Sequence, residues 1–100
     1  MTNPVPIALA QLNAHLGNID ANISRLAGAR ANAAANGAEI IVTPEMYLSG
    51  YPCDDLVLRD DFMNDVANGI DKLAALTSDG GPAIAVGAPT KDSGGIYNSV

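Results

Sequence analysis

Residues 38–44 read AEIIVTP, and this short segment decides the fold class of the chain. Ala38–Thr43 is mostly apolar and β-branched, which is typical of a strand, and Pro44 ends it because proline has no N–H for a sheet ladder. Two other runs have the same character, Val5–Leu12 (VPIALAQL) and Ala83–Ala88 (AIAVGA). Continuous apolar runs of this length are typical of strands buried on both faces of a parallel sheet.

Helical periodicity separates these strands. Apolar residues recur at helical spacing over about Ile19–Ala35 and again over about Asp61–Thr77. The order β-α-β-α-β, with crossovers long enough to join parallel strands, predicts an α/β sheet with right-handed connections. After a turn at Asp92–Gly95, we expect a fourth strand at Ile96–Val100.

The helix ends carry recognisable signals. We expect Asn18 to cap the first helix and Gly37 to terminate it. Asp60 or Asp61 is expected to cap the second helix. Arg30 falls on the otherwise apolar stripe of the first helix.

The strand faces raise a problem for a chain of this length. Strands that are apolar on both sides need a layer above and a layer below, and two helices cover only one of them. The chain also stops at Val100 inside a β-like run. We therefore expect residues 1–100 to be the first part of a larger, incomplete domain, or to be covered by a partner.

Composition excludes several classes of protein. The 100 residues are 48% hydrophobic and only 16% charged, so the chain is expected to pack rather than remain disordered. A net charge of −6 argues against binding to nucleic acid or to an anionic membrane. The apolar runs are too short to span a bilayer. A single cysteine excludes an intramolecular disulfide and favours the cytoplasm.

Glu45 is the strongest candidate for chemistry. It is one of two glutamates, and it directly follows Pro44 at the carboxyl end of the second strand. Ligands and catalytic groups collect at the carboxyl ends of strands in open α/β sheets. On position alone, a solvated loop carboxylate is the simpler interpretation.

The segments around Glu45 resemble a known family. The stretch at 43–52 reads TPEMYLSGYP and is followed by CDDLVLR; AQLN, LGNI, AVGAP and YNS occur at 10–13, 16–19, 85–89 and 97–99. Together they resemble the nitrilase (carbon–nitrogen hydrolase) superfamily over essentially the whole chain. Within it they are most similar to the N-terminal glutaminase domain of the glutamine-dependent NAD(+) synthetases. The Pro-Glu pair at a strand end is specific for the superfamily.

The resemblance implies both a fold and a reaction. The fold would be the start of a nitrilase-type α-β-β-α sandwich, and the catalytic set would be Glu–Lys–Cys with Glu45 as the glutamate. In that set a thiolate attacks the amide, the glutamate moves the protons, and the lysine stabilises the oxyanion. Lys72, Lys91 and Cys53 do not lie in the family motifs. The segment alone is therefore expected to be inactive.

Further implications concern substrate and partners. The substrate would be glutamine, with Tyr51 lining the amide pocket; Tyr47 is a weaker candidate for the same role. The ammonia would pass to a synthetase domain, outside these residues, that uses ATP and Mg²⁺ to amidate deamido-NAD. The segment itself would need no cofactor. Self-association into a homo-oligomer is also implied.

Other interpretations stay open. The chain could belong to a stand-alone carbon–nitrogen hydrolase acting on another small amide, carbamoyl compound or nitrile. It could also be a non-catalytic α/β fragment or an interaction module. A catalytic pair of Cys53 and His15 is disfavoured, because the two residues are far apart in unrelated contexts. The aspartates fit no metal-binding pattern, and no G-x-G-x-x-G is present.

Overall fold

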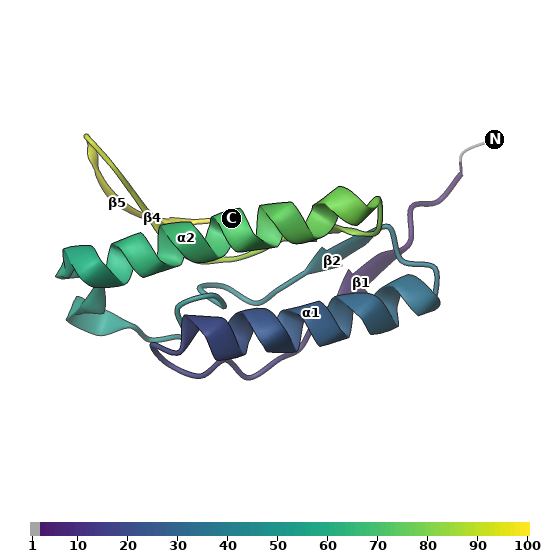
Figure 1. The fold of residues 1–100 in the computed structure, drawn as a ribbon, viewed down its shortest axis with the longest axis horizontal. Helices are drawn as coiled ribbons and strands as arrows, with labels where there is room; N and C mark the ends of the chain where they lie inside the picture. Colours follow the sequence, from purple (N-terminus) through teal and green to yellow (C-terminus); the bar gives the residue numbers. More distant parts are fainter. Residues whose placement is uncertain (1–2) are drawn as a thin grey trace.

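The computed structural model describes residues 3–100 (Figure 1). Strands and helices alternate along the chain, as the periodicity predicts. The elements are β1 (Ile7–Leu9), α1 (Ile19–Ala35), β2 (Ile40–Val42), the 3₁₀ helix η1 (Asp54–Leu58), α2 (Asp60–Leu76), the 3₁₀ helix η2 (Thr77–Asp79), β3 (Ala83–Ala85), β4 (Ala88–Asp92) and β5 (Gly95–Ser99).

A parallel sheet in the order β1-β2-β3 forms the centre of the fold. Ile7 pairs with Ile40, and Ile41 pairs with Ile84, so the three strands are in register. Each strand has three residues and is therefore shorter than the sequence predicts. Backbone hydrogen bonds continue for one residue beyond β2 in both directions. At Pro44 they stop, because proline has no N–H to donate. The predicted parallel α/β arrangement is confirmed.

The two long helices begin and end close to the predicted positions. The Asn18 side chain accepts a hydrogen bond from the Ala21 N–H at 3.1 Å, which confirms it as the cap of α1. Gly37 follows α1 with a φ of +85°, the left-handed conformation that glycine adopts most easily. The predicted aspartate cap of α2 is wrong. Arg59 occupies the capping position, and its side chain makes no capping hydrogen bond. Both aspartates lie in the first turn, where their negative charge interacts favourably with the helix dipole.

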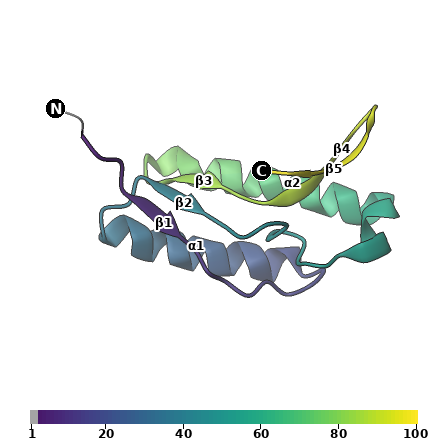
Figure 2. The ribbon, with the colours of Figure 1, turned by 180° about the vertical axis from the view of Figure 1, so that it is seen from behind.

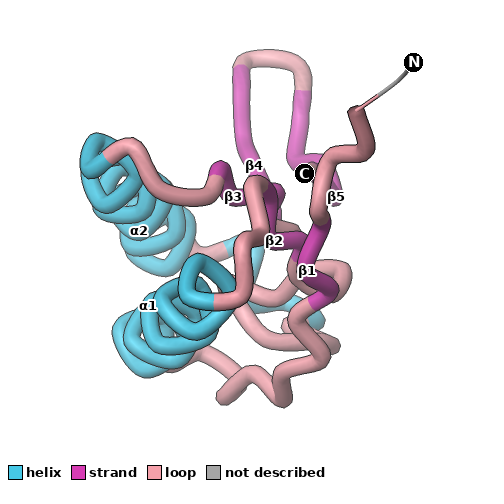
Figure 3. Tube along the Cα trace, turned by 90° about the vertical axis from the view of Figure 1, so that its right-hand side faces the viewer, coloured by secondary structure: helices cyan, strands magenta, loops and turns pink. Residues whose placement is uncertain are grey.

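Both helices lie on the same side of the sheet (Figure 3). Leu26 of α1, Ile41 of β2, and Val66 and Leu73 of α2 are buried between the two layers. Leu48, from the loop after β2, completes this core. Ala8 of β1 and Ala10, directly after it, pack against this core.

The opposite face of the sheet is uncovered by the described residues (Figure 2). Ile7 and Leu9 project from it with 55% and 73% of their surface exposed. Ile40 and Val42 of β2 are half-buried. The described residues therefore bury one face of the sheet and leave the other open. The expectation that two helices cover only one face is confirmed.

The segment after β3 differs from the prediction. The expected strand over Ala83–Ala88 breaks after Ala85, and a separate antiparallel hairpin of β4 and β5 follows (Figure 1). The predicted turn before the last strand is confirmed, but β4 is missing from the sequence prediction. Its residues APTKD contain Pro89 and no apolar alternation, so they resemble a loop.

Arg30 makes the only ion pair of the described residues in which one side chain is almost fully buried. Its Nε donates to the carbonyl of Pro82 at 2.8 Å, and its two terminal nitrogens donate to the carboxylate of Asp79 at 3.0 and 2.7 Å. The guanidinium, and then the N–H of Gly81, lower the pKa of Asp79 well below its usual range. Arg30 thus joins the middle of α1 to the connection before β3.

This ion pair predicts a pH-dependent stability. In Asp79→Asn the buried guanidinium loses the charge of its partner, so the melting temperature at neutral pH should fall. The pKa of Asp79 is lower in the folded protein than in the unfolded chain, where it is about 4. Its contribution is therefore complete above about pH 5 and is lost as the pH falls. Melting curves should be measured between about pH 7 and pH 2. The difference in melting temperature between Asp79→Asn and wild type should become smaller as the pH falls.

The exposed Asp71 of α2 provides a matched control. Asp71→Asn should change the melting temperature little at any pH. If the melting temperature of Asp79→Asn stays below that of wild type by the same amount at every pH, the role of the ion pair is contradicted.

Candidate active site

Glu45 lies at the carboxyl edge of the sheet, in the loop that follows β2. The loop is closed by hydrogen bonds from the Tyr47 N–H to the Pro44 carbonyl at 3.3 Å and from the Leu48 N–H to the Gly87 carbonyl at 3.0 Å. The hydroxyl of Thr43 accepts from the Gly87 N–H at 3.0 Å. Gly87 therefore bonds to both ends of the segment that contains Glu45.

The backbone beside Gly87 passes too close for any other residue. An ideal Cβ on Gly87 would lie 2.6 Å from the Pro44 carbonyl oxygen and 2.6 Å from the Met46 nitrogen. Met46, directly after Glu45, has a φ of +55°. This left-handed conformation costs a non-glycine residue on the order of 1–3 kcal/mol and is found where the surroundings impose it. Close packing against Gly87 and the loop hydrogen bonds impose it here.

A buried polar network attaches the same loop to α1. The side chain of Asn22 accepts from the His15 N–H at 2.7 Å and donates to the carbonyls of His15 and Leu48 at 2.9 and 3.0 Å. The Tyr47 hydroxyl donates to the Asn22 carbonyl at 2.7 Å. Burial raises the pKa of Tyr47, which keeps this hydroxyl protonated as a donor. Asn22 was not predicted to be buried, although its position three residues after Ile19 and four before Leu26 places it on the helix stripe.

The Glu45 carboxylate has a partner that the sequence did not reveal. The side-chain amide of Asn98, on β5, donates to Glu45 Oε1 at 2.6 Å. In the sequence, Asn98 contributes only to the family resemblance of the YNS segment. It is 53 residues from Glu45 along the chain.

Glu45 and Tyr51 line the same cavity, which has a volume of about 190 Å³. Its other lining residues are Leu12, Asn13, Ala14, Pro44 and Tyr47. Tyr51 is 70% exposed, whereas Tyr47 is almost completely buried with its hydroxyl bonded to α1. Of the two tyrosines, Tyr51 is thus the one whose side chain is accessible to a small molecule. A neighbouring cavity of about 310 Å³ contacts both Tyr51 and Asn98.

Comparison with known proteins identifies the family. The family model described as carbon-nitrogen hydrolase matches residues 6–100. The chain belongs to the carbon–nitrogen hydrolase family. Among curated relatives, the glutamine-dependent NAD(+) synthetase of Rhodobacter capsulatus is 40% identical over 99 residues, which cover 99% of this chain and 18% of that protein. The enzyme of the same name from Thermotoga maritima is 33% identical over 93 residues, covering 93% and 16%.

Solved structures agree with this assignment. A glutamine-dependent NAD(+) synthetase from Cytophaga hutchinsonii superposes with a TM-score of 0.84 at 26% identity, covering 94% of this chain and 16% of that one. This match confirms the predicted N-terminal part of a nitrilase-type fold. The chain spans less than a fifth of the length of these synthetases.

The two lysines and the cysteine of the chain do not contact Glu45 through any hydrogen bond of the described residues. Lys72 bonds to Asp20 at 3.1 Å, and Lys91 bonds to Asp60 at 2.8 Å. Cys53 is a buried free thiol that lines the neighbouring cavity. The hydrogen bonds within residues 3–100 do not join it to His15, whose backbone belongs to the Asn22 network.

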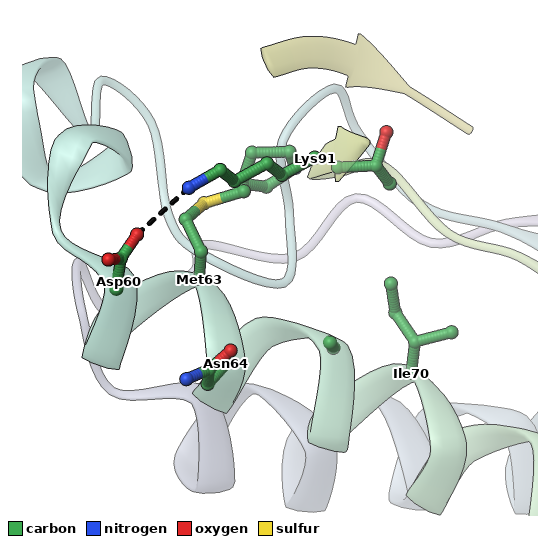
Figure 4. Close-up of a pocket in the computed structure, with 8 residues that line it drawn as sticks. Asp60, Met63, Asn64, Ile70 and Lys91 are labelled. Atoms are coloured by element: carbon green, nitrogen blue, oxygen red, sulfur yellow. Dashed lines mark hydrogen bonds and ion pairs between the residues drawn. The ribbon is translucent and has the colours of Figure 1, made fainter. Parts of the chain in front are cut away.

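A further cavity lies away from Glu45, between α2 and β4, with a volume of about 600 Å³ (Figure 4). Met63, Asn64 and Ile70 line it from α2, and the ion pair of Asp60 and Lys91 closes one end. Lys91 is held there in an exposed ion pair with Asp60, and the size of a cavity alone does not make it an active site.

Two further findings concern the described part of the chain. Residues 3–100 hold no cluster of three or more histidine, cysteine, aspartate or glutamate side chains that could bind a metal ion. Within the same residues, neither helix combines the length and the apolar character needed to cross a bilayer.

The close approach of Gly87 to the Pro44–Met46 backbone predicts that a side chain at this position destabilises the fold. Gly28, which has open space around it, provides the control. Gly87→Ala places a methyl group against the Pro44–Met46 backbone, so unfolding free energy should fall by about 1–3 kcal/mol. Gly28→Ala, in α1, meets nothing within 4 Å and should raise it by about 0.5–1 kcal/mol. Denaturant unfolding of both variants measures the difference. Equal behaviour of the two would show that Gly87 is not sterically constrained.

Proposed function

We propose that residues 1–100 form the N-terminal part of a glutaminase domain, and that the full-length protein hydrolyses glutamine to supply ammonia for the ATP-dependent amidation of deamido-NAD to NAD. The observation that carries this proposal is the Glu45 carboxylate, held at the carboxyl edge of the sheet and lining a cavity with Tyr51. The relatives at 40% and 33% identity, both glutamine-dependent NAD(+) synthetases, support the choice of substrate.

Glu45 would serve as the proton carrier of the reaction. It takes the proton of a cysteine thiol, and the thiolate attacks the amide carbon to form a tetrahedral intermediate. Glu45 then returns the proton to the departing nitrogen, which leaves as ammonia and a thioester remains. In the second half it accepts a proton from water as the water oxygen adds to the thioester carbon. The C–S bond then breaks, glutamate is released, and the cysteine thiolate takes the proton back from Glu45. The cysteine and an oxyanion-stabilising lysine would come from outside these residues, so this segment alone is inactive.

The uncovered face of the sheet supports placing those residues in a further part of the same domain. Ile7 and Leu9 leave apolar surface that a second layer would bury, as in an α-β-β-α sandwich. We also propose that ATP and Mg²⁺ are bound by a synthetase domain outside these residues. We further propose a cytoplasmic, homo-oligomeric protein.

The role of Glu45 is tested in the full-length protein. Glu45→Gln keeps the shape of the side chain and an acceptor for Asn98 but removes the base. Glutamine-dependent NAD synthesis should fall by more than about 100-fold. Synthesis from added ammonia should continue, because it bypasses amide hydrolysis. Glu45→Ala should behave in the same way.

Glu39, the only other glutamate, is exposed and provides the control. Glu39→Gln should leave both activities unchanged. Glutamine-driven turnover that survives in Glu45→Gln would refute the proposed function. Hydrolysis of a different amide, carbamoyl compound or nitrile, without ammonia-dependent synthesis, would favour a stand-alone carbon–nitrogen hydrolase.

Tyr51 is tested as a substrate-binding residue. Because its exposed ring lines the cavity beside Glu45, Tyr51→Ala should raise the KM for glutamine by about 10-fold, the effect of losing one apolar contact. The kcat should change less. Leu58→Ala, which also removes a large exposed side chain, lies outside this cavity and is the control. An unchanged KM in Tyr51→Ala would remove Tyr51 from the site.

A further inference from the structure

We infer that Asn98 is a positioning residue for Glu45: its side-chain amide holds one carboxylate oxygen, so that the other is presented to the reacting groups. This inference rests on the proposed function. It assigns a role to a residue outside the Glu–Lys–Cys set, and it is carried by the contact between β5 and the loop after β2.

The contact has the character of a strong hydrogen bond. The donor–acceptor distance between Asn98 Nδ2 and Glu45 Oε1 is 2.6 Å, just below the usual range of about 2.7–2.9 Å for N–H···O bonds with a charged partner. A neutral amide neither competes for the proton that Glu45 must carry nor neutralises its charge. Asn98 can therefore fix the orientation of the carboxylate while leaving it able to act as a base.

The hairpin holds Asn98 in place. Asn98 pairs with Pro89 of β4, whose side chain is fully buried, and the flanking hydroxyls of Thr90 and Ser99 lie 2.7 Å apart. The hairpin begins directly after Gly87, which is itself bonded to the loop that contains Glu45. Two contacts thus connect the hairpin region to the loop that contains Glu45. One is made by the backbone of Gly87, and the other by the side chain of Asn98.

A purely structural role explains less of this geometry. Asn98 is exposed in this chain and contributes nothing to the apolar core. The single hydrogen bond of its side chain is the one to Glu45, within the residues that the structure describes. Its position on a strand face would accept many residues, but an apolar side chain there could not donate to the carboxylate.

The test compares two near-isosteric variants in the full-length protein. Asn98→Leu removes the donor, and Asn98→Asp also places a second carboxylate against Glu45. We expect kcat for glutamine hydrolysis to fall by about 10- to 100-fold, more in the aspartate variant, because a misplaced base loses its alignment. KM should stay within about threefold, and ammonia-dependent synthesis should be unchanged. Asn32→Asp, on the exposed face of α1, is the matched control and should leave kcat unaltered.

A polarity swap tests the contact separately from catalysis. Asn98→Asp alone should lower the melting temperature through the repulsion of two carboxylates. Combining it with Glu45→Gln restores one donor and one acceptor, so the melting temperature should recover while glutaminase activity stays absent. A double variant no more stable than Asn98→Asp would show that the two side chains do not interact.

The outcomes separate this inference from the proposed function. If Glu45→Gln retains glutaminase activity, the proposed function fails, whatever Asn98 does. If Glu45→Gln is inactive and Asn98→Leu keeps kcat within about twofold of wild type, only the positioning role is overturned. A parallel loss of ammonia-dependent synthesis in Asn98→Leu would also overturn it, because the role would then be structural.

Discussion

Because Gly87 has no side chain, its backbone can contact the backbone of Pro44–Met46, the segment that carries Glu45. The Pro44 carbonyl and the Met46 N–H lie where a Cβ on Gly87 would have to be. Because the segments approach so closely, the Thr43 hydroxyl and the Leu48 N–H can both bond to Gly87. The strained φ of Met46 is tolerated only under these contacts. Glu45 is therefore held by its neighbours on both sides, at the edge of a parallel sheet where such folds carry their chemistry.

Polar contacts, more than apolar packing, fix the orientation of this loop. Apolar packing is non-directional, whereas the hydrogen bonds of Asn22 to His15 and Leu48 specify one arrangement of α1 against the loop. The hydroxyl of Tyr47 adds a further hydrogen bond between the loop and α1, to the Asn22 carbonyl. Within residues 3–100, the buried side-chain nitrogens and oxygens all have hydrogen-bond partners. A fully satisfied network of this kind is the support that a catalytic carboxylate needs from its surroundings.

Local signals predicted the helices well and the strand ends poorly. The periodicity of α1, its Asn18 cap and the terminating Gly37 are short-range features, and all three are confirmed. The predicted aspartate cap of α2 is wrong. The Asp61 carboxylate instead accepts hydrogen bonds from the Arg59 side chain and from the backbone N–H of Phe62. Strand β4 was missed because its stability comes from pairing with β5 and from burial of Pro89, neither of which leaves a periodic pattern.

By itself, the sequence determined the α/β class, the order of the elements, the placement of Glu45 just beyond a strand and the resemblance to carbon–nitrogen hydrolases. These depend on spacing and on residue types that act over a few positions. Tertiary structure alone decided that Asn22 bonds to the loop that carries Glu45, and that Asn98 meets Glu45 across 53 residues. Such contacts depend on how the crossovers and the hairpin return to the sheet. That is a property of the packed chain, and no local pattern encodes it.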